Sequence, residues 1–71
     1  MVFILKTVSV LGSTGSVGKN TLEVISKLPD KFTLYAISCN ENTSLLHHQI
    51  IKYKPRFAVI TNHEKYYDFI N

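Results

Sequence analysis

Three glycines within seven residues, Gly12, Gly15 and Gly18, constrain the fold of this 71-residue chain more than any other feature of its sequence. A β-type run at residues 7–11 comes before them, and apolar residues at helical spacing come after them. A glycine-rich turn between a strand and a helix is the context in which backbone amides bind the pyrophosphate of a dinucleotide. Residues 12–18 are therefore predicted to form a nucleotide-binding loop.

Each glycine of this loop is predicted to have its own role. Gly12 makes the tight turn after the strand, Gly15 lets a phosphate approach the backbone, and Gly18 lets the helix pack closely on the strand. The free N–H groups and the dipole at the start of the helix favour an anion. Thr14 and Ser16 add hydroxyl donors between the glycines.

Two other readings of the loop compete with a dinucleotide site. One is a glycine-rich turn that binds nothing, which the sequence alone leaves open. The other is a P-loop, and the spacing excludes it. The first glycine of that motif would fall on Ser13, and the residue that binds magnesium would fall on Asn20.

The rest of the chain alternates between helical and extended patterns. Apolar spacing predicts that the first helix continues to Leu28. Runs rich in aromatic and β-branched residues predict strands at Phe32–Cys39 and Phe57–Ile60. A second helix is expected to end before Pro55, and a third is expected to have Asn62 as its N-cap. The apolar positions of these two helices are Leu46, Ile50, Tyr53, Tyr66, Phe69 and Ile70.

The order β-α-β-α-β-α predicts an α/β fold, a Rossmann-type half-domain with a three-stranded parallel sheet and right-handed crossovers. Residues 1–71 are predicted to be a truncated part of a dinucleotide (NADP)-binding domain, with the remainder of an enzyme absent. In the strand order of such a domain, 3-2-1-4-5-6, the first strand would have an open edge and both crossover helices would lie on one face. Only residues 63–71 would remain to cover the second face, so a homo-oligomer is expected.

The end of the second predicted strand bears on the choice between NAD and NADP. A loop that prefers NAD usually has an acidic residue there, about 20 residues beyond the glycines, which binds the ribose 2′-hydroxyl. Ser38 stands at this place and carries no charge, which favours NADP. Glu41, between Asn40 and Asn42 in the following turn, would favour NAD if it pointed inwards, and is otherwise a solvated turn residue.

Charge and composition exclude several classes of protein. The formal net charge is +3, but the eight basic residues are scattered, so no nucleic-acid partner is expected. No apolar run approaches the ~20 residues that span a bilayer, so no membrane association is expected. The single cysteine, Cys39, allows no internal disulfide and predicts a cytoplasmic protein, or one of the plastid stroma if a transit peptide was removed. The adjacent His47 and His48 do not share a helix face and are a poor metal pair.

Several segments have a recognisable order and spacing. The loop sequence GSTGSVG at residues 12–18 is the most specific of them. The others, which are weak one by one, are Thr21 and Leu22, Phe32, Ala36, Asn42 and the sequence YKPRFAV at residues 53–59. Together they resemble the N-terminus of the 1-deoxy-D-xylulose 5-phosphate reductoisomerase family over nearly the whole chain.

The resemblance implies an enzyme of the non-mevalonate isoprenoid route. Members of the family make 2-C-methyl-D-erythritol 4-phosphate from a phosphorylated sugar, with NADPH and a divalent metal, Mg or Mn. By position, residues 14–17 (Thr14, Gly15, Ser16 and Val17) would hold the pyrophosphate, and residues 40–42 would lie beside the adenosine ribose and its 2′-phosphate.

Two positions depart from the family pattern, which has glycine at Asn40 and often a basic residue at Glu41. The second departure weakens the expected contact with the 2′-phosphate. The family's metal-binding and substrate-binding residues lie beyond residue 71, so no catalytic or metal-binding residue is predicted here, and the chain is expected to be too short to be the whole catalyst.

Two further functions are compatible with the same residues. A nucleotide-binding regulator or sensor would use the loop without catalysis. Another NADP-dependent reductase with a GxxGxxG loop would share both the loop and the fold, because the fold alone does not decide the function.

Overall fold

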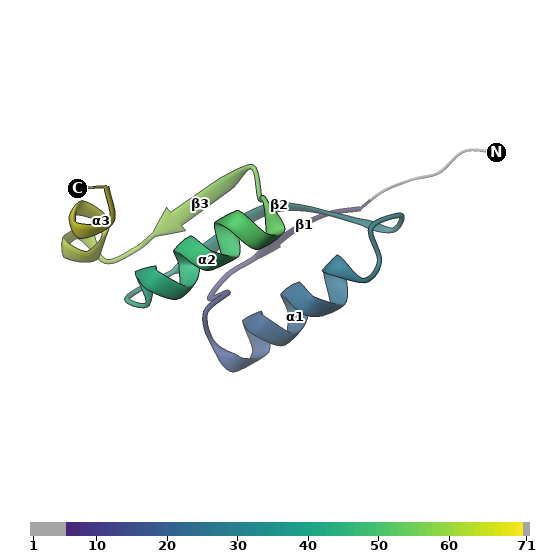
Figure 1. Cartoon of the computed structure of the whole chain (residues 1–71), viewed down its shortest axis with the longest axis horizontal. Helices are drawn as coiled ribbons and strands as arrows, with labels where there is room; N and C mark the ends of the chain where they lie inside the picture. The colour runs from purple at the N-terminus through teal and green to yellow at the C-terminus, as the bar shows by residue number, and fades with distance from the viewer. Residues whose placement is uncertain (1–5, 71) are drawn as a thin grey trace.

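The computed structural model describes residues 6–70 and contains three strands and three helices in strict alternation (Figure 1). The predicted order β-α-β-α-β-α is therefore confirmed. The elements are β1 (Lys6–Val10), α1 (Ser16–Ser26), β2 (Phe32–Cys39), α2 (Thr43–Tyr53), β3 (Phe57–Ile60) and α3 (His63–Ile70).

The three strands form one parallel sheet in the order β1-β2-β3, with β2 in the centre. This is the predicted half of a Rossmann sheet. The register between β1 and β2 shifts once, because Val8 pairs with Leu34 while Ser9 pairs with Ala36. Tyr35 is the additional residue of β2 at this irregularity. The shift keeps Leu34 and Ile37 on the face that packs against the helices, although they are three positions apart.

Both crossover helices cover the same face of the sheet, as right-handed connections require. Figure 1 shows α1 and α2 side by side on one side of the strands; α1 packs on β1 and β2, and α2 packs on β2 and β3. The buried apolar residues lie between these helices and the sheet in one cluster of Val10, Leu22, Ile25, Ile37, Cys39 and Leu46. Burial raises the pKa of the Cys39 thiol, so this residue is a small core side chain.

The opposite face of the sheet exposes apolar side chains. Tyr35 and Phe57 contact each other there, with ring centroids 5.2 Å apart, and both are exposed, as is Val59. α3 does not cover them: it packs against α2 and β3, and the ring of Phe69 lies 5.9 Å from that of His47. The expected uncovered face is therefore present in this chain.

Two element boundaries differ from the sequence prediction. β1 ends at Val10, because Leu11 already belongs to the turn that Gly12 makes. α1 ends at Ser26 and not at Leu28. The amides of Lys27 and Leu28 bond to carbonyls three residues earlier, which tightens the last turn into 3₁₀ geometry.

Candidate functional site

The glycine loop connects β1 to α1 at the carboxyl end of the sheet. The loop lies beside the turn that follows β2, since Val10 pairs with Ile37 and the two parallel strands end at the same edge. A hollow of about 480 Å³ opens between β1, the loop and the start of α1; residues 8–12, residues 15–18 and Thr21 line it. Ligands of open α/β sheets bind at this edge. The loop and this hollow are therefore the candidate site.

The three glycines meet different constraints in the folded chain. Gly12 has a φ of +71°, in the left-handed region, so the predicted turn after the strand is confirmed. A Cβ on Gly18 would overlap the carbonyl oxygen of Gly12 and come within 2.6 Å of the Cα of Ser13. The predicted close approach of the helix at Gly18 is therefore present, but the helix approaches the backbone of the loop and not the strand. A Cβ on Gly15 would make only an ordinary contact, 3.5 Å from the Gly12 carbonyl oxygen.

The N-terminus of α1 presents backbone amides without partners inside the helix. The first intrahelical bond runs from the amide of Lys19 to the carbonyl of Gly15, at 2.8 Å. The amides of Ser16, Val17 and Gly18 come before it, and Gly15 as N-cap has no side chain that could accept from them. Gly15, Ser16 and Val17 are all exposed. The arrangement can donate several hydrogen bonds to one anion, and the helix dipole favours that anion.

Ser38 holds the start of the loop. Its hydroxyl oxygen accepts from the amide of Gly12 at 3.0 Å, and its carbonyl accepts from the amide of Ser13 at 2.8 Å. Its position at the end of the second predicted strand placed Ser38 beside a cofactor, and its lack of charge favoured NADP. In the structure its hydroxyl contacts the loop backbone, so it also fixes the path of the loop.

A second support of the loop, from Gln49 on α2, was not found by sequence reasoning. The Gln49 amide nitrogen donates to the carbonyl of Ser13, and the Ser13 hydroxyl donates back to the Gln49 side-chain oxygen, both at 2.8 Å. Both side chains are buried. The two residues are 36 positions apart, and only the position of Gln49 among apolar neighbours on the buried side of α2 could have marked it.

The turn after β2 brings the other predicted residues to the same edge. The side-chain oxygen of Asn40 accepts from the Thr61 hydroxyl at 2.9 Å, so this residue is fixed against the chain that follows β3. Asn42 is the N-cap of α2, and its side-chain oxygen accepts from the amide of Leu45 at 3.2 Å. Glu41 is exposed between them. All three residues of this turn are exposed, and no hydrogen bond from the two asparagine amide nitrogens is formed within the described chain.

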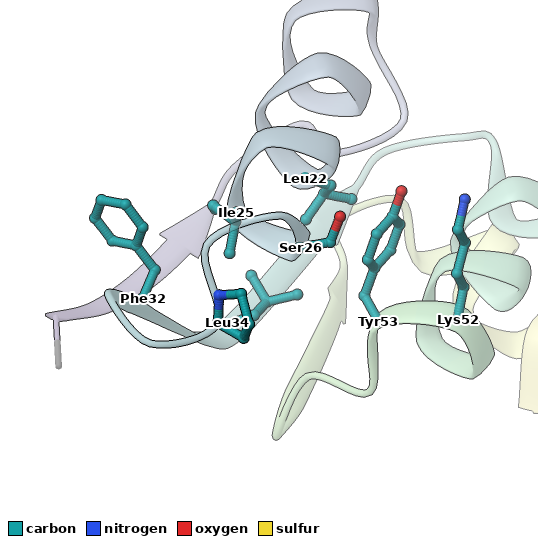
Figure 2. Close-up of a pocket in the computed structure, with 8 residues that line it drawn as sticks. Leu22, Ile25, Ser26, Phe32, Leu34, Lys52 and Tyr53 are labelled. Carbon is teal, nitrogen blue, oxygen red and sulfur yellow. The ribbon is translucent and has the colours of Figure 1, made fainter.

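A second hollow, of about 260 Å³, lies between α1 and α2 (Figure 2). Figure 2 shows Leu22, Ile25 and Ser26 entering it from α1 and Tyr53 from α2. Phe32, the first residue of β2, also lines this hollow, so the hollow lies at the amino end of the strand. Ligands of parallel sheets bind at the carboxyl ends, so this hollow is not part of the candidate site.

Among residues 6–70, no group of three or more histidine, cysteine or acidic residues is arranged to hold a metal ion. His47 and His48 are both exposed on α2.

None of the helices that the structure describes has the length and apolar character needed to cross a membrane.

Fold and loop together define a Rossmann-type nucleotide-binding half-domain. The family model described as 1-deoxy-D-xylulose 5-phosphate reductoisomerase matches residues 8–71, almost the whole chain. The chain belongs to this family, and the resemblance read from the sequence is confirmed.

Relatives and a solved structure agree with this assignment. The reductoisomerase of Wigglesworthia glossinidia brevipalpis is 46% identical over 65 residues, which are 90% of this chain and 16% of that protein. That of Halothermothrix orenii is 49% identical over 57 residues, 80% of this chain and 15% of that protein. The reductoisomerase of Zymomonas mobilis, solved in complex with NADPH, superposes with a TM-score of 0.84 at 33% identity, over 94% of this chain and 18% of that one. The chain thus spans about a sixth of the length of these relatives.

Proposed function

We propose that this chain is the NADPH-binding part of a 1-deoxy-D-xylulose 5-phosphate reductoisomerase. The full enzyme would isomerise a phosphorylated sugar and reduce it to 2-C-methyl-D-erythritol 4-phosphate, with a divalent metal bound by residues outside this chain. The observation that carries the proposal is the N-terminus of α1. Its first amides, from Ser16 to Gly18, have no side-chain cap, and these three residues line the hollow beside the glycine loop. The NADPH complex of the Zymomonas mobilis relative supports the choice of cofactor.

In this proposal the loop binds the pyrophosphate of the cofactor. The amides of Ser16, Val17 and Gly18 donate to its oxygens, and the hydroxyls of Thr14 and Ser16 add further donors. Gly15 leaves the space that the phosphate needs. When bound, NADPH supplies the hydride for reduction, and the chain contributes its binding and orientation.

The turn after β2 binds the adenosine ribose in the same proposal. Asn40 and Asn42 can direct their amide nitrogens at the ribose and its 2′-phosphate, since their side-chain oxygens already accept from Thr61 and Leu45. The Glu41 carboxylate would repel the 2′-phosphate. We therefore expect the preference for NADPH over NADH to be smaller than in a relative with a basic residue at this position.

The test is a titration of the folded chain with NADPH and with NADH, followed by a turnover assay with magnesium or manganese and the sugar phosphate. We expect binding of both nucleotides, with NADPH bound more tightly, and no turnover by the chain alone. A folded chain that binds neither nucleotide would contradict the proposed function. NADPH oxidation above a blank without protein would contradict the expected lack of turnover, provided that Gly15→Ser abolished it. The reaction would then come from this chain.

We also propose that residues 1–71, when isolated from the rest of the enzyme, associate with copies of themselves. The edge of β1 that faces away from β2 has no strand beside it in the described chain, and open edges pair with other chains. Tyr35, Phe57 and Val59 expose apolar surface on the uncovered face, which favours a partner at about 25 cal/mol per Å² buried. Light scattering over a dilution series should detect a dimer or larger assembly, and a stable monomer at high concentration would contradict this.

A further inference from the structure

Gln49 occupies a core position on α2 that its chemistry does not suit. It is 4% exposed, one turn beyond the fully buried Leu46, on the side of the helix that faces the sheet. A buried amide costs free energy unless its donor and acceptor are both paired. Here both are paired with a single residue: the nitrogen donates to the Ser13 carbonyl, and the oxygen accepts from the Ser13 hydroxyl.

Ser13 is fixed at every polar group as a result. Its amide donates to the carbonyl of Ser38 on β2 and its carbonyl accepts from Gln49 on α2. Its hydroxyl donates to the Gln49 side-chain oxygen at 2.8 Å and also lies 3.3 Å from the Ser38 carbonyl. The residue is fully buried, so no water competes for these bonds. A loop residue held from two different elements has little freedom to shift.

The position of Ser13 determines the position of the α1 N-terminus. Gly18 packs so closely on this part of the loop that a Cβ there would lie 2.6 Å from the Cα of Ser13. A movement of Ser13 would therefore move the first turn of α1, which carries the amides of Ser16 and Val17. The hydrogen bonds between Gln49 and Ser13 thus affect the position of the α1 amides, although Gln49 itself lies outside the nucleotide site.

We propose that Gln49 is a positioning residue for the nucleotide-binding loop, which it holds through the paired hydrogen bonds to Ser13. The inference rests on the proposed function, because it concerns the same site. Gln49 does not touch the nucleotide; it fixes the backbone that does. A purely structural polar contact would change the stability of the protein, whereas a positioning contact also changes the affinity for the nucleotide at a given stability.

The first experiment compares Gln49→Leu with wild type in the full-length protein that contains this segment. Leucine fills similar space and removes both bonds, so the Ser13 carbonyl loses its partner. We expect the KM for NADPH to rise about tenfold while kcat changes less than twofold. The control is Leu46→Val on the same helix face, which should lower the melting temperature and leave the KM for NADPH unchanged. A folded Gln49→Leu protein with wild-type KM would overturn the inference.

A second variant keeps the inference testable if Gln49→Leu does not fold. Ser13→Ala removes the hydroxyl, with its 2.8 Å bond to Gln49 and its longer 3.3 Å contact to the Ser38 carbonyl, but keeps the carbonyl bond to Gln49; we expect NADPH affinity to fall about threefold. In the double variant the shared bond is lost only once, so its affinity should match that of Gln49→Leu or of Ser13→Ala, whichever is weaker. Full multiplication of the two single effects would show that the residues act independently and would overturn the inference.

A measurement without nucleotide separates this inference from the proposed function. Amide hydrogen exchange of unliganded protein reports how firmly the loop is held. We expect the Ser13 amide to exchange faster in Ser13→Ala and in Gln49→Leu than in wild type or Leu46→Val. Unchanged exchange would overturn the positioning role even if NADPH binds well. If the exchange pattern is as expected but the wild-type protein does not bind NADPH, the proposed function is contradicted. The exchange pattern would in that case still show that Gln49 holds the loop in position.

Discussion

The N-termini of the three helices differ in how their first amides are satisfied. α2 begins after Asn42, whose side chain accepts from the amide of Leu45, and α3 begins after Asn62, whose side chain accepts from the amide of Lys65 at 3.1 Å. α1 begins after Gly15, which has no side chain to offer. Asparagine is among the preferred N-caps, and both α2 and α3 begin after an asparagine whose side chain caps the helix. The first amides of α1 are therefore left open to a partner from outside the chain, as the proposed function requires.

The backbone at Gly15 strengthens this comparison. Its φ of −77° and ψ of 171° are extended values that any residue adopts. An added Cβ would meet only the Gly12 carbonyl oxygen, at ordinary contact distance. The folded chain by itself therefore has no need of glycine at this position. A serine would fit here and could cap the helix, whereas the pyrophosphate of the proposed function needs the space that a side chain would fill.

Gly18→Ala should produce the largest effect, on stability. The new methyl group would overlap backbone atoms of Gly12 and Ser13, and backbone cannot move aside as a flexible side chain can. We expect the free energy of unfolding to fall by about 3 kcal/mol or more, at the upper end of overpacking costs. Denaturant titration measures this, with the exposed Asn20→Ala on the same helix as a control that should change stability by about 0.5 kcal/mol or less. Equal stability of the two variants would show that the loop and helix can separate without cost.

Gly15→Ser should separate binding from stability. The serine hydroxyl can cap α1, so the free energy of unfolding should stay equal or rise by a few tenths of a kcal/mol. The same side chain would fill the phosphate space and occupy an amide, and NADPH affinity should fall about 100-fold, which is about 2.7 kcal/mol. Calorimetric titration gives the affinity, and His47→Ala on the exposed side of α2 is the control. If both variants bound NADPH equally well, the α1 N-terminus would not be the site.

Asn62→Ala should have the smallest effect and the opposite pattern. It removes the cap of α3, and we expect a loss of about 1 kcal/mol in stability with no change in NADPH affinity. Thermal unfolding and a nucleotide titration on the same sample measure both quantities. If Asn62→Ala lowered NADPH affinity as much as Gly15→Ser does, the uncapped N-terminus of α1 would not differ from the capped N-terminus of α3 in its role in binding.

The sequence predicted the architecture because its signals are local. The apolar periodicity, Asn62 as a cap and the turn at Gly12 each depend on neighbouring residues, and the structure agrees with all three. The parallel order of the strands followed from the alternation of elements and the handedness of their connections. Boundaries were less accurate, as the early end of α1 at Ser26 shows, since the last turn of a helix tightens in ways that periodicity does not encode.

The features that sequence reasoning missed depend on contacts between distant segments. The bonds between Ser13 and Gln49 join a loop to a helix 36 positions later, and a lone glutamine on a helix resembles a surface residue. The register shift opposite Tyr35 exists only when two strands are paired. Asn40 and Asn42 were recognised as candidate ligand-binding residues, but their bonds to Thr61 and Leu45 required the folded turn.

An NMR titration of the folded chain with NADPH, followed through backbone amide shifts, tests directly whether the N-terminus of α1 is the nucleotide site. We expect the amides of Ser16, Val17 and Gly18 to shift most, because they bind the pyrophosphate, while those at the capped start of α3, residues 63–65, stay in place. Unmoved amides at the start of α1, together with shifts around the hollow between α1 and α2, would contradict this expectation.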